Sequence, residues 1–131
     1  MIGVDTNILL RFLTADDADQ HACTVDFFGR RSPADPAFVS AVALAETIWV
    51  LRKAYGYGER DIARAVEMLT SSDDFVVEGC EALQAENGDL VSPIQIADFL
   101  IAHLGRRAGC SHTVTFDRYA AGSVAGMELL S

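Results

Sequence analysis

The sequence predicts an α/β fold in which short apolar strands alternate with longer amphipathic helices. Strands are expected at residues 2–4, 37–39, 75–77, 112–115 and 127–130, with helical patterns between them. Crossovers between parallel strands are right-handed and place helices on both faces of a sheet, so this order predicts five parallel strands covered on each side. A chain of 131 residues, half of them apolar, is the size of one domain. We therefore expect a single domain over residues 1–131.

The first half of the chain carries four helical patterns. Residues 5–7 open a helix that extends to residue 13, and a second helix is expected over residues 16–30, before Ser32 and Pro33 interrupt it. Ser40 is a plausible N-cap for a helix that ends near residue 55, where Gly56 follows. Residues 59–70 place their apolar side chains on one face, which predicts a further amphipathic helix.

The second half of the chain predicts two more helices. A short one is expected over residues 78–86. A longer one begins at Ser92 and Pro93, where Ser is the expected N-cap, Pro takes the first helical position and Gln95 completes a capping box. This helix is expected to end near residue 107, before Gly109.

Charge and cysteine usage limit the possible classes of function. The net charge of −9 lowers the expectation of indiscriminate nucleic-acid binding, which usually leaves a basic surface. A cluster of carboxylates that holds divalent cations would, however, contribute negative charge that the cations neutralise. The three cysteines are far apart, and no apolar run could span a membrane. With no secretory leader at the N-terminus, we expect a cytoplasmic location.

Three acidic residues are expected where a sheet of this kind binds ligands, and a fourth, Asp98, would reach the same edge only if its helix packs accordingly. Asp5 ends the first strand, Asp117 follows the fourth, and Glu46 lies two turns into the helix after the second. Asp98 lies early in the helix that leads to the fourth strand. Open α/β sheets bind ligands outside the carboxyl ends of their strands, and clustered carboxylates suit Mg²⁺ or Mn²⁺. A metal bound there can activate water for attack on a phosphodiester.

Each of these acids also has a purely structural interpretation. Asp5 and Asp117 directly follow strands, where an aspartate often caps the next helix or turns the chain. Glu46 and Asp98 each interrupt an apolar run, which also fits a solvated stripe on a helix. Position alone leaves these alternatives open.

Taken together, four motifs resemble the PIN-domain nucleases and, within them, the VapC-type toxins of toxin–antitoxin pairs. The motifs appear in the family's order and with family-like spacing over nearly the whole chain. They are VDTN at residues 4–7, AE at 45–46 followed by WVL at 49–51, ADFLIA at 97–102 and TFDR at 115–118.

The resemblance implies a set of functional residues and a cofactor. Four acids look like the family's catalytic and metal-binding quartet: Asp5, Asp98, Glu46 and Asp117. Of these, the first two look like the principal ligands of Mg²⁺ or Mn²⁺. Two polar residues, Asn7 and Thr115, look like accessory neighbours that orient the cluster or a bound water.

The resemblance also implies a fold, an activity and partners. The family's fold is a three-layer α/β/α sandwich whose parallel sheet has the order 3-2-1-4-5. Its activity is metal-dependent endoribonuclease cleavage of RNA. The toxins of the family are typically homodimers, each held inactive by a cognate VapB-like antitoxin whose C-terminal segment lies across the active site. These properties are what the resemblance leads us to expect of this chain.

Three other functions fit less well. A solitary PIN nuclease needs no antitoxin, and a non-catalytic PIN-like binding module commonly lacks one or more of the acids. An enzyme that handles small phosphates is the third alternative. A phospho-accepting receiver domain needs a lysine after a late strand, but the only lysine is Lys53. An aspartyl-phosphatase would carry a second acid where this chain has Asn7.

Overall fold

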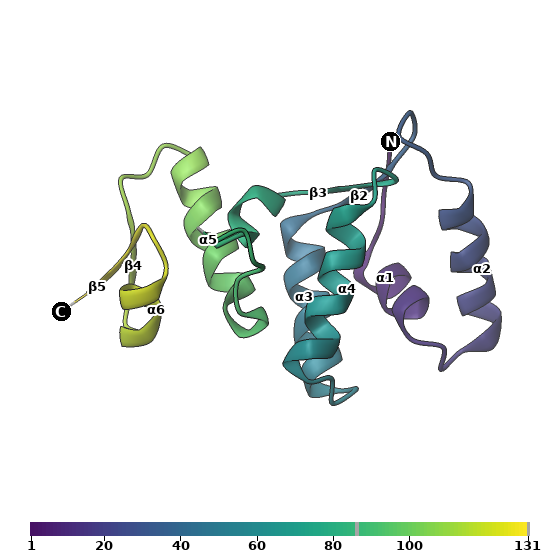
Figure 1. Ribbon diagram of the computed structural model, residues 1–131, viewed down its shortest axis with the longest axis horizontal. Helices are drawn as coiled ribbons and strands as arrows, with labels where there is room; N and C mark the ends of the chain where they lie inside the picture. Colours follow the sequence, from purple (N-terminus) through teal and green to yellow (C-terminus); the bar gives the residue numbers. More distant parts are fainter. Residues whose placement is uncertain (86, 131) are drawn as a thin grey trace. The chain divides into compact units, whose positions relative to one another are not determined.

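The computed structural model describes residues 1–85 and 87–130. It divides into two compact units, an N-terminal unit (Met1–Glu78) and a C-terminal unit (Gly79–Ser131), each of which combines helices with parallel strands (Figure 1). The last residue of the predicted helix over residues 78–86, Glu86, lies outside the described residues.

The N-terminal unit contains a three-stranded parallel sheet. Its strands are β1 (Ile2–Gly3), β2 (Ala37–Val39) and β3 (Phe75–Val77), in the order β1-β2-β3. The central strand is the best buried, since Ala37 and Val39 have no exposed surface. The positions of β2 and β3 are as predicted, whereas β1 is one residue shorter.

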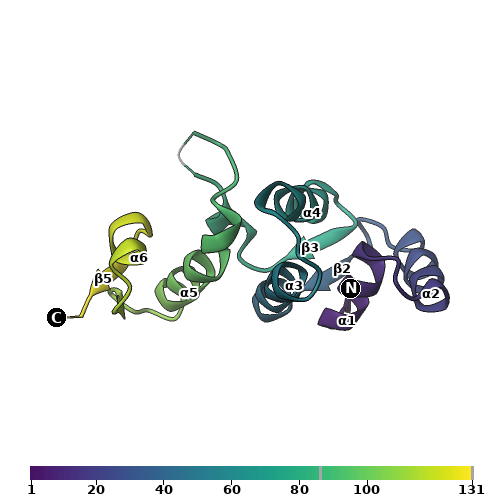
Figure 2. The same cartoon turned by 90° about the horizontal axis from the view of Figure 1, so that it is seen from below.

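Four helices connect and accompany these strands: α1 (Thr6–Leu13), α2 (Ala18–Gly29), α3 (Ala41–Lys53) and α4 (Glu59–Ser71). Helix α1 packs against α2 and α3, and α3 lies beside α4 (Figure 2). The predicted N-cap of α3 is confirmed, because the Ser40 hydroxyl accepts a hydrogen bond from the backbone N–H of Ala43 at 3.1 Å. The helical patterns of the first half of the sequence thus predicted the four helices to within a few residues.

Large aliphatic side chains form the core of the N-terminal unit. Leu44 and Leu51 of α3 are each 1% exposed, and they lie seven residues apart, two helical turns on the same face. Helix α4 contributes Ile62, Val66 and Leu69 at helical spacing, all nearly inaccessible to solvent. This spacing is why the sequence buries one face of each helix.

The C-terminal unit is built from shorter elements. They are two 3₁₀ turns, η1 (Cys80–Leu83) and η2 (Pro93–Gln95), then α5 (Ile96–Arg107), β4 (Thr113–Thr115), α6 (Arg118–Ser123) and β5 (Met127–Leu129). The strands β4 and β5 pair in parallel, with Thr113 opposite Met127. A small cluster of Ala102, Ala120, Val124 and Met127, with Phe99 packed against it, is buried between α5, α6 and β5.

Two expectations about the C-terminal unit were wrong, and one helix was missed. The residues from 78 to 85 contain a 3₁₀ turn rather than an α-helix. Ser92 makes no capping hydrogen bond, because the turn η2 intervenes and the Gln95 amide instead donates to the Ser123 hydroxyl at 2.6 Å. Helix α6 was not predicted, although Asp117 caps it.

The α/β class with parallel strands is confirmed. The strands form a three-stranded and a two-stranded sheet rather than the single sheet of five that was predicted. The neighbours in the predicted order 3-2-1 and the pair 4-5 are present, while the pairing of β1 with β4 stays a prediction, as does a single domain over residues 1–131. In residues 1–85 and 87–130, no helix has the length and apolar character needed to cross a membrane.

Candidate functional site

Asp5 joins β1 to α1 and caps that helix. Its backbone is extended, and its Oδ1 accepts a hydrogen bond from the N–H of Thr6 at 2.7 Å. The capping interpretation of the sequence is therefore correct. The residue is nonetheless exposed, and its second carboxylate oxygen accepts no hydrogen bond from any described residue, so this oxygen remains open to another ligand.

Glu46 projects from the exposed face of α3. The neighbouring positions Thr47 and Ile48 are buried, whereas Glu46 shares its face with the exposed Val42 and Trp49. Among the described residues, none makes an ion pair or a hydrogen bond with the Glu46 carboxylate. The predicted solvated stripe is therefore also present here, and two of its members are large apolar residues.

Asp98 lies at the border between a buried and an exposed face of α5. Of the residues one turn away, Gln95 of η2 and Ala102 are buried, whereas Ile94 and Ile101 are exposed. Asp98 itself is half-buried. Burial, together with the negative charge of Asp117, raises the pKa of the Asp98 carboxyl above its ordinary value. Two acids of the C-terminal unit therefore lie close enough to repel each other.

Asp117 is held rigidly at the start of α6. Its Oδ1 accepts hydrogen bonds from the N–H groups of Tyr119 at 2.9 Å and Ala120 at 3.0 Å, so the capping interpretation is again correct. Its own N–H donates to the Thr115 hydroxyl at 3.0 Å. Thr115 thus orients Asp117 through the backbone, which is compatible with the accessory role that the resemblance implied for it.

The structure brings together two of the four predicted acids. Asp98 and Asp117 belong to the C-terminal unit and interact, whereas Asp5 and Glu46 belong to the N-terminal unit. Within the described ranges, no group of three or more Asp, Glu, His or Cys residues is close enough to hold a metal ion. The pair that does form suits a hard divalent cation, because the cation supplies oxygen ligation and offsets the repulsion between the two carboxylates.

Asn7, the other predicted accessory residue, lines a hollow. The hollow, of about 450 Å³, lies between β1, α1 and α2, and its lining is largely apolar, including Ile2, Ile8 and Phe27. None of its lining residues is acidic. The role of Asn7 in a metal site stays a prediction.

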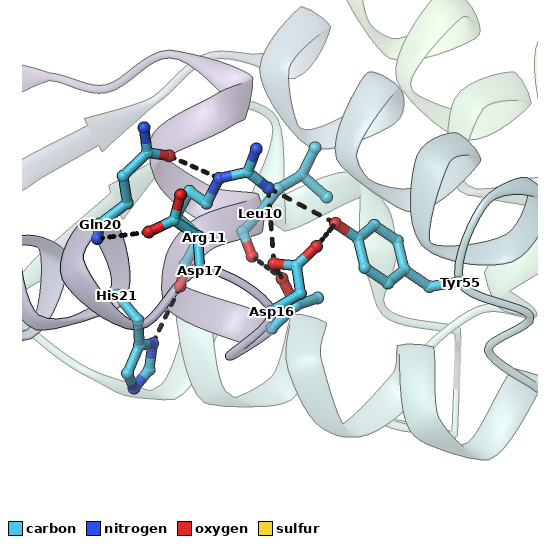
Figure 3. A network of polar contacts seen from close by, with 8 residues as sticks. Leu10, Arg11, Asp16, Asp17, Gln20, His21 and Tyr55 are labelled. Atoms are coloured by element: carbon cyan, nitrogen blue, oxygen red, sulfur yellow. Dashed lines mark hydrogen bonds and ion pairs between the residues drawn. The ribbon is translucent and has the colours of Figure 1, made fainter.

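The cation nearest to Asp5 in the sequence has structural partners. Arg11 of α1 donates from Nε to the Gln20 side chain at 2.6 Å and faces Asp16 and the Tyr55 hydroxyl, each at 3.5 Å (Figure 3). The Tyr55 hydroxyl donates to the other oxygen of Asp16 at 2.7 Å. This network joins α1 to the segments that begin α2 and follow α3.

The segment that contains Asp117 holds exposed residues to which the sequence analysis assigned no role. Phe116 and Tyr119 are exposed, and so is Arg118, whose guanidinium forms no ion pair with the residues described. The exposure of Tyr119 follows from the cap at Asp117, which starts α6 so that Ala120 faces the core and Tyr119 does not. A helix predicted after Asp117 would have indicated the exposure of Tyr119, but not that of Phe116.

Comparisons with known proteins were consistent with the motifs. The family model of the PIN domain matches residues 2–122. No curated protein matches the chain. A solved structure that resembles it is Mycobacterium tuberculosis VapC20, described as a Sarcin-Ricin loop cleaving toxin. The two chains are 18% identical, the match covers 98% of this chain and 99% of that one, and the TM-score is 0.48. The family assignment therefore rests on the PIN-domain match.

Proposed function

The chain belongs to the PIN-domain family, and on that premise we propose that it is an endoribonuclease that uses Mg²⁺ or Mn²⁺ to hydrolyse phosphodiester bonds. The observation that carries the proposal is the interacting pair Asp98 and Asp117, in which one carboxyl is half-buried and has a raised pKa. A pair of carboxylates with this mutual repulsion favours a bound cation over two bare charges.

The complete site would contain all four acids. Asp5 and Glu46 would join the pair if β4 extended the sheet beside β1, because the carboxyl ends of both strands would then lie at one edge. This arrangement is the order 3-2-1-4-5 that the resemblance implied. Two observations support it. One carboxylate oxygen of Asp5 and both of Glu46 make no hydrogen bond with the described residues, so they are free to bind a cation.

The residues of this chain would perform distinct tasks in the reaction. The carboxylates of Asp5, Asp98, Glu46 and Asp117 would hold the cation and orient a water for in-line attack. When bound, the cation supplies the charge that activates the water and stabilises the leaving oxygen. The hydrogen bonds from Tyr119 and Ala120 to Asp117 keep that carboxylate in one orientation before substrate arrives.

We further propose that the protein is the toxin of a type II toxin–antitoxin pair, acts as a homodimer in the cytoplasm and is inhibited by a VapB-like antitoxin. The order and spacing of the four motifs support the VapC type. The net charge of −9 supports a partner that brings basic residues to the acidic site. A neighbouring open reading frame for a small DNA-binding protein would favour this interpretation, whereas its absence would favour a solitary PIN nuclease.

The activity has a direct test. Purified protein freed of any partner should cleave RNA with Mg²⁺ or Mn²⁺, stop when EDTA is added and resume with excess Mg²⁺. Asp98→Asn and Asp5→Asn should each lower the cleavage rate by more than about 100-fold while leaving the circular dichroism spectrum unchanged, because each removes a metal-directed charge.

Glu67→Gln is the matched control, because Glu67 is an exposed acid of α4 outside the four motifs. This variant should cleave like the wild type. Undiminished cleavage by both aspartate variants would show that the site is elsewhere. A well-folded wild-type protein that binds Mg²⁺ but cuts no RNA would favour the alternative of a non-catalytic PIN-like binding module.

A further inference from the structure

The most exposed aromatic side chains of the described structure flank one of the candidate acids. Phe116 is 80% exposed and Tyr119 is 71% exposed, on either side of Asp117. Arg118 lies between Asp117 and Tyr119 and is also exposed, with no ion-pair partner among the described residues. Residues 116–119, the aromatic segment, therefore present two rings, a carboxylate and a guanidinium to the surroundings of the C-terminal unit.

The backbone of the aromatic segment is fixed by several hydrogen bonds. Asp117 is bonded at its N–H to Thr115 and at its carboxylate to the N–H groups of Tyr119 and Ala120. The Tyr119 carbonyl accepts a hydrogen bond from the Ser123 hydroxyl at 2.6 Å. Ala120, 1% exposed, anchors the helix in the core cluster. Binding of a ligand to these rings would therefore cost little conformational entropy, because the backbone that carries them is already ordered.

The net charge of the chain helps to identify the class of ligand that would bind to these rings. With 19 acidic and 10 basic residues, general electrostatic attraction cannot supply much affinity for a polyanion. Stacking of nucleobases on aromatic rings does not depend on net charge, and single-stranded RNA is recognised largely in this way. Aromatic rings beside a single free guanidinium thus suit RNA better than an acidic peptide, which offers no bases to stack.

We propose that the aromatic segment binds single-stranded RNA, with Phe116 and Tyr119 stacking on nucleobases and Arg118 contacting a phosphate. The proposal rests on the proposed function, because it places the bases next to an acid of the cleavage site. It goes further by assigning the recognition of unpaired bases to two specific rings. The aromatic segment would not bind duplex RNA in this way, because the bases of a duplex are already stacked on each other.

The test separates base stacking from backbone contact. Fluorescence anisotropy would measure binding of a labelled 12-nucleotide oligoadenylate and of an abasic ribose-phosphate oligomer of equal length, with Ca²⁺ in place of Mg²⁺. Phe116→Ala and Tyr119→Ala should each weaken oligoadenylate binding by about 5- to 100-fold and leave abasic binding unchanged. Arg118→Ala should weaken the binding of both oligomers equally. It should also reduce the slope of log affinity against log salt concentration by about the amount expected for one phosphate contact.

Val25→Ala, a truncation of an exposed apolar side chain on α2, is the control and should alter neither affinity. The melting temperatures of Phe116→Ala and Tyr119→Ala should equal that of the wild type. A fall of several degrees in both would show that the rings pack against the protein itself or a second copy, which overturns the proposal. Equal loss on both oligomers, or no wild-type binding to oligoadenylate, overturns it as well.

The outcome is separable from that of the proposed function. If the wild type cleaves RNA and Phe116→Ala binds oligoadenylate normally, this inference fails and the nuclease stands. If the base-selective loss is observed but no RNA is cleaved with any metal, the segment binds RNA and the nuclease proposal fails.

Discussion

The two units of this chain bury their apolar surface in different ways. The N-terminal unit packs large aliphatic side chains such as Leu44, Leu51 and Ile62 around a three-stranded sheet. The C-terminal unit also buries large side chains, such as Ile96 and Leu100, but fewer of them, and its sheet has two strands. The interacting acids, however, belong to the second unit.

This difference indicates where the candidate site gets its stability. Two paired strands form a marginal structure in water, and a short segment buries a small fraction of its surface. The N-terminal unit buries more large apolar side chains, and each contributes to stability at about 25 cal/mol per Å² of buried apolar surface. We therefore expect the C-terminal unit, and with it Asp98 and Asp117, to depend on the rest of the chain for its folded state.

The largest expected effect comes from core truncation in each unit. Leu51→Ala in α3 and Leu100→Ala in α5 remove side chains that are 1% and 2% exposed, so each should cost about 2–5 kcal/mol of unfolding free energy. If residues 1–131 unfold as one domain, both variants should shift the same transition. Urea unfolding monitored by fluorescence of Trp49, which lies in the N-terminal unit, measures this.

The two variants serve as controls for each other. A Leu100→Ala protein whose Trp49 transition matches the wild type, while its far-ultraviolet circular dichroism transition moves to lower urea, would contradict the single-domain prediction. It would show instead that the two units unfold independently.

A smaller effect is expected from two glycines with similar backbones. Gly56 and Gly79 have φ of +67° and +77°, so alanine at either position should cost about 1–2 kcal/mol. At Gly56 an added Cβ meets open space, whereas at Gly79 it would lie 2.8 Å from Leu100 Cδ2. Because Leu100 is buried, Gly79→Ala should cost about 1–3 kcal/mol more than Gly56→Ala.

Chemical denaturation of the two alanine variants measures this difference. Equal costs would mean that the Leu100 side chain can move aside freely, and the C-terminal unit would then be more loosely packed than its burial indicates. Gly56→Ala, which adds only the backbone strain, is the control for the N-terminal unit.

Local patterns predicted the N-terminal unit better than the C-terminal unit. Strands β2 and β3 and the Ser40 cap depend on a few adjacent residues, and all three were predicted correctly. The capping box at Ser92 failed because Gln95 finds its partner in Ser123, 28 residues along the chain. No local pattern contains that information.

In the candidate site, too, the features set by adjacent residues were predicted and those set by distant contacts were not. The capping positions of Asp5 and Asp117 are local and were foreseen as alternatives, and both turned out to be real. The partial burial of Asp98, by contrast, depends on how α5 packs against later elements. The exposure of Phe116 also could not be read from sequence, because an aromatic residue at a strand end is usually buried.

The smallest expected effect tests the polar network of the N-terminal unit. The hydrogen bond from the Tyr55 hydroxyl, followed by that from Thr14, lowers the pKa of the Asp16 carboxyl below its ordinary value of 3.8. Tyr55→Phe removes the stronger of these bonds, so the pKa of Asp16 should rise towards 3.8. Tyr57→Phe should leave it unchanged, because Tyr57 makes no side-chain hydrogen bond to the described part of the chain.

The sign of the stability effect follows from the direction of that shift. A carboxyl whose pKa is lower in the folded state stabilises the fold at pH values above its ordinary pKa. This contribution is lost as the pH falls through the lower pKa of the folded state. Tyr55→Phe should therefore melt slightly below the wild type near neutral pH, and the two should converge once Asp16 is protonated in both. Carbon-13 titration of the Asp16 carboxyl measures the pKa directly. An unchanged value would mean that this network does not hold α1 in solution, although it joins three segments of the better-packed unit.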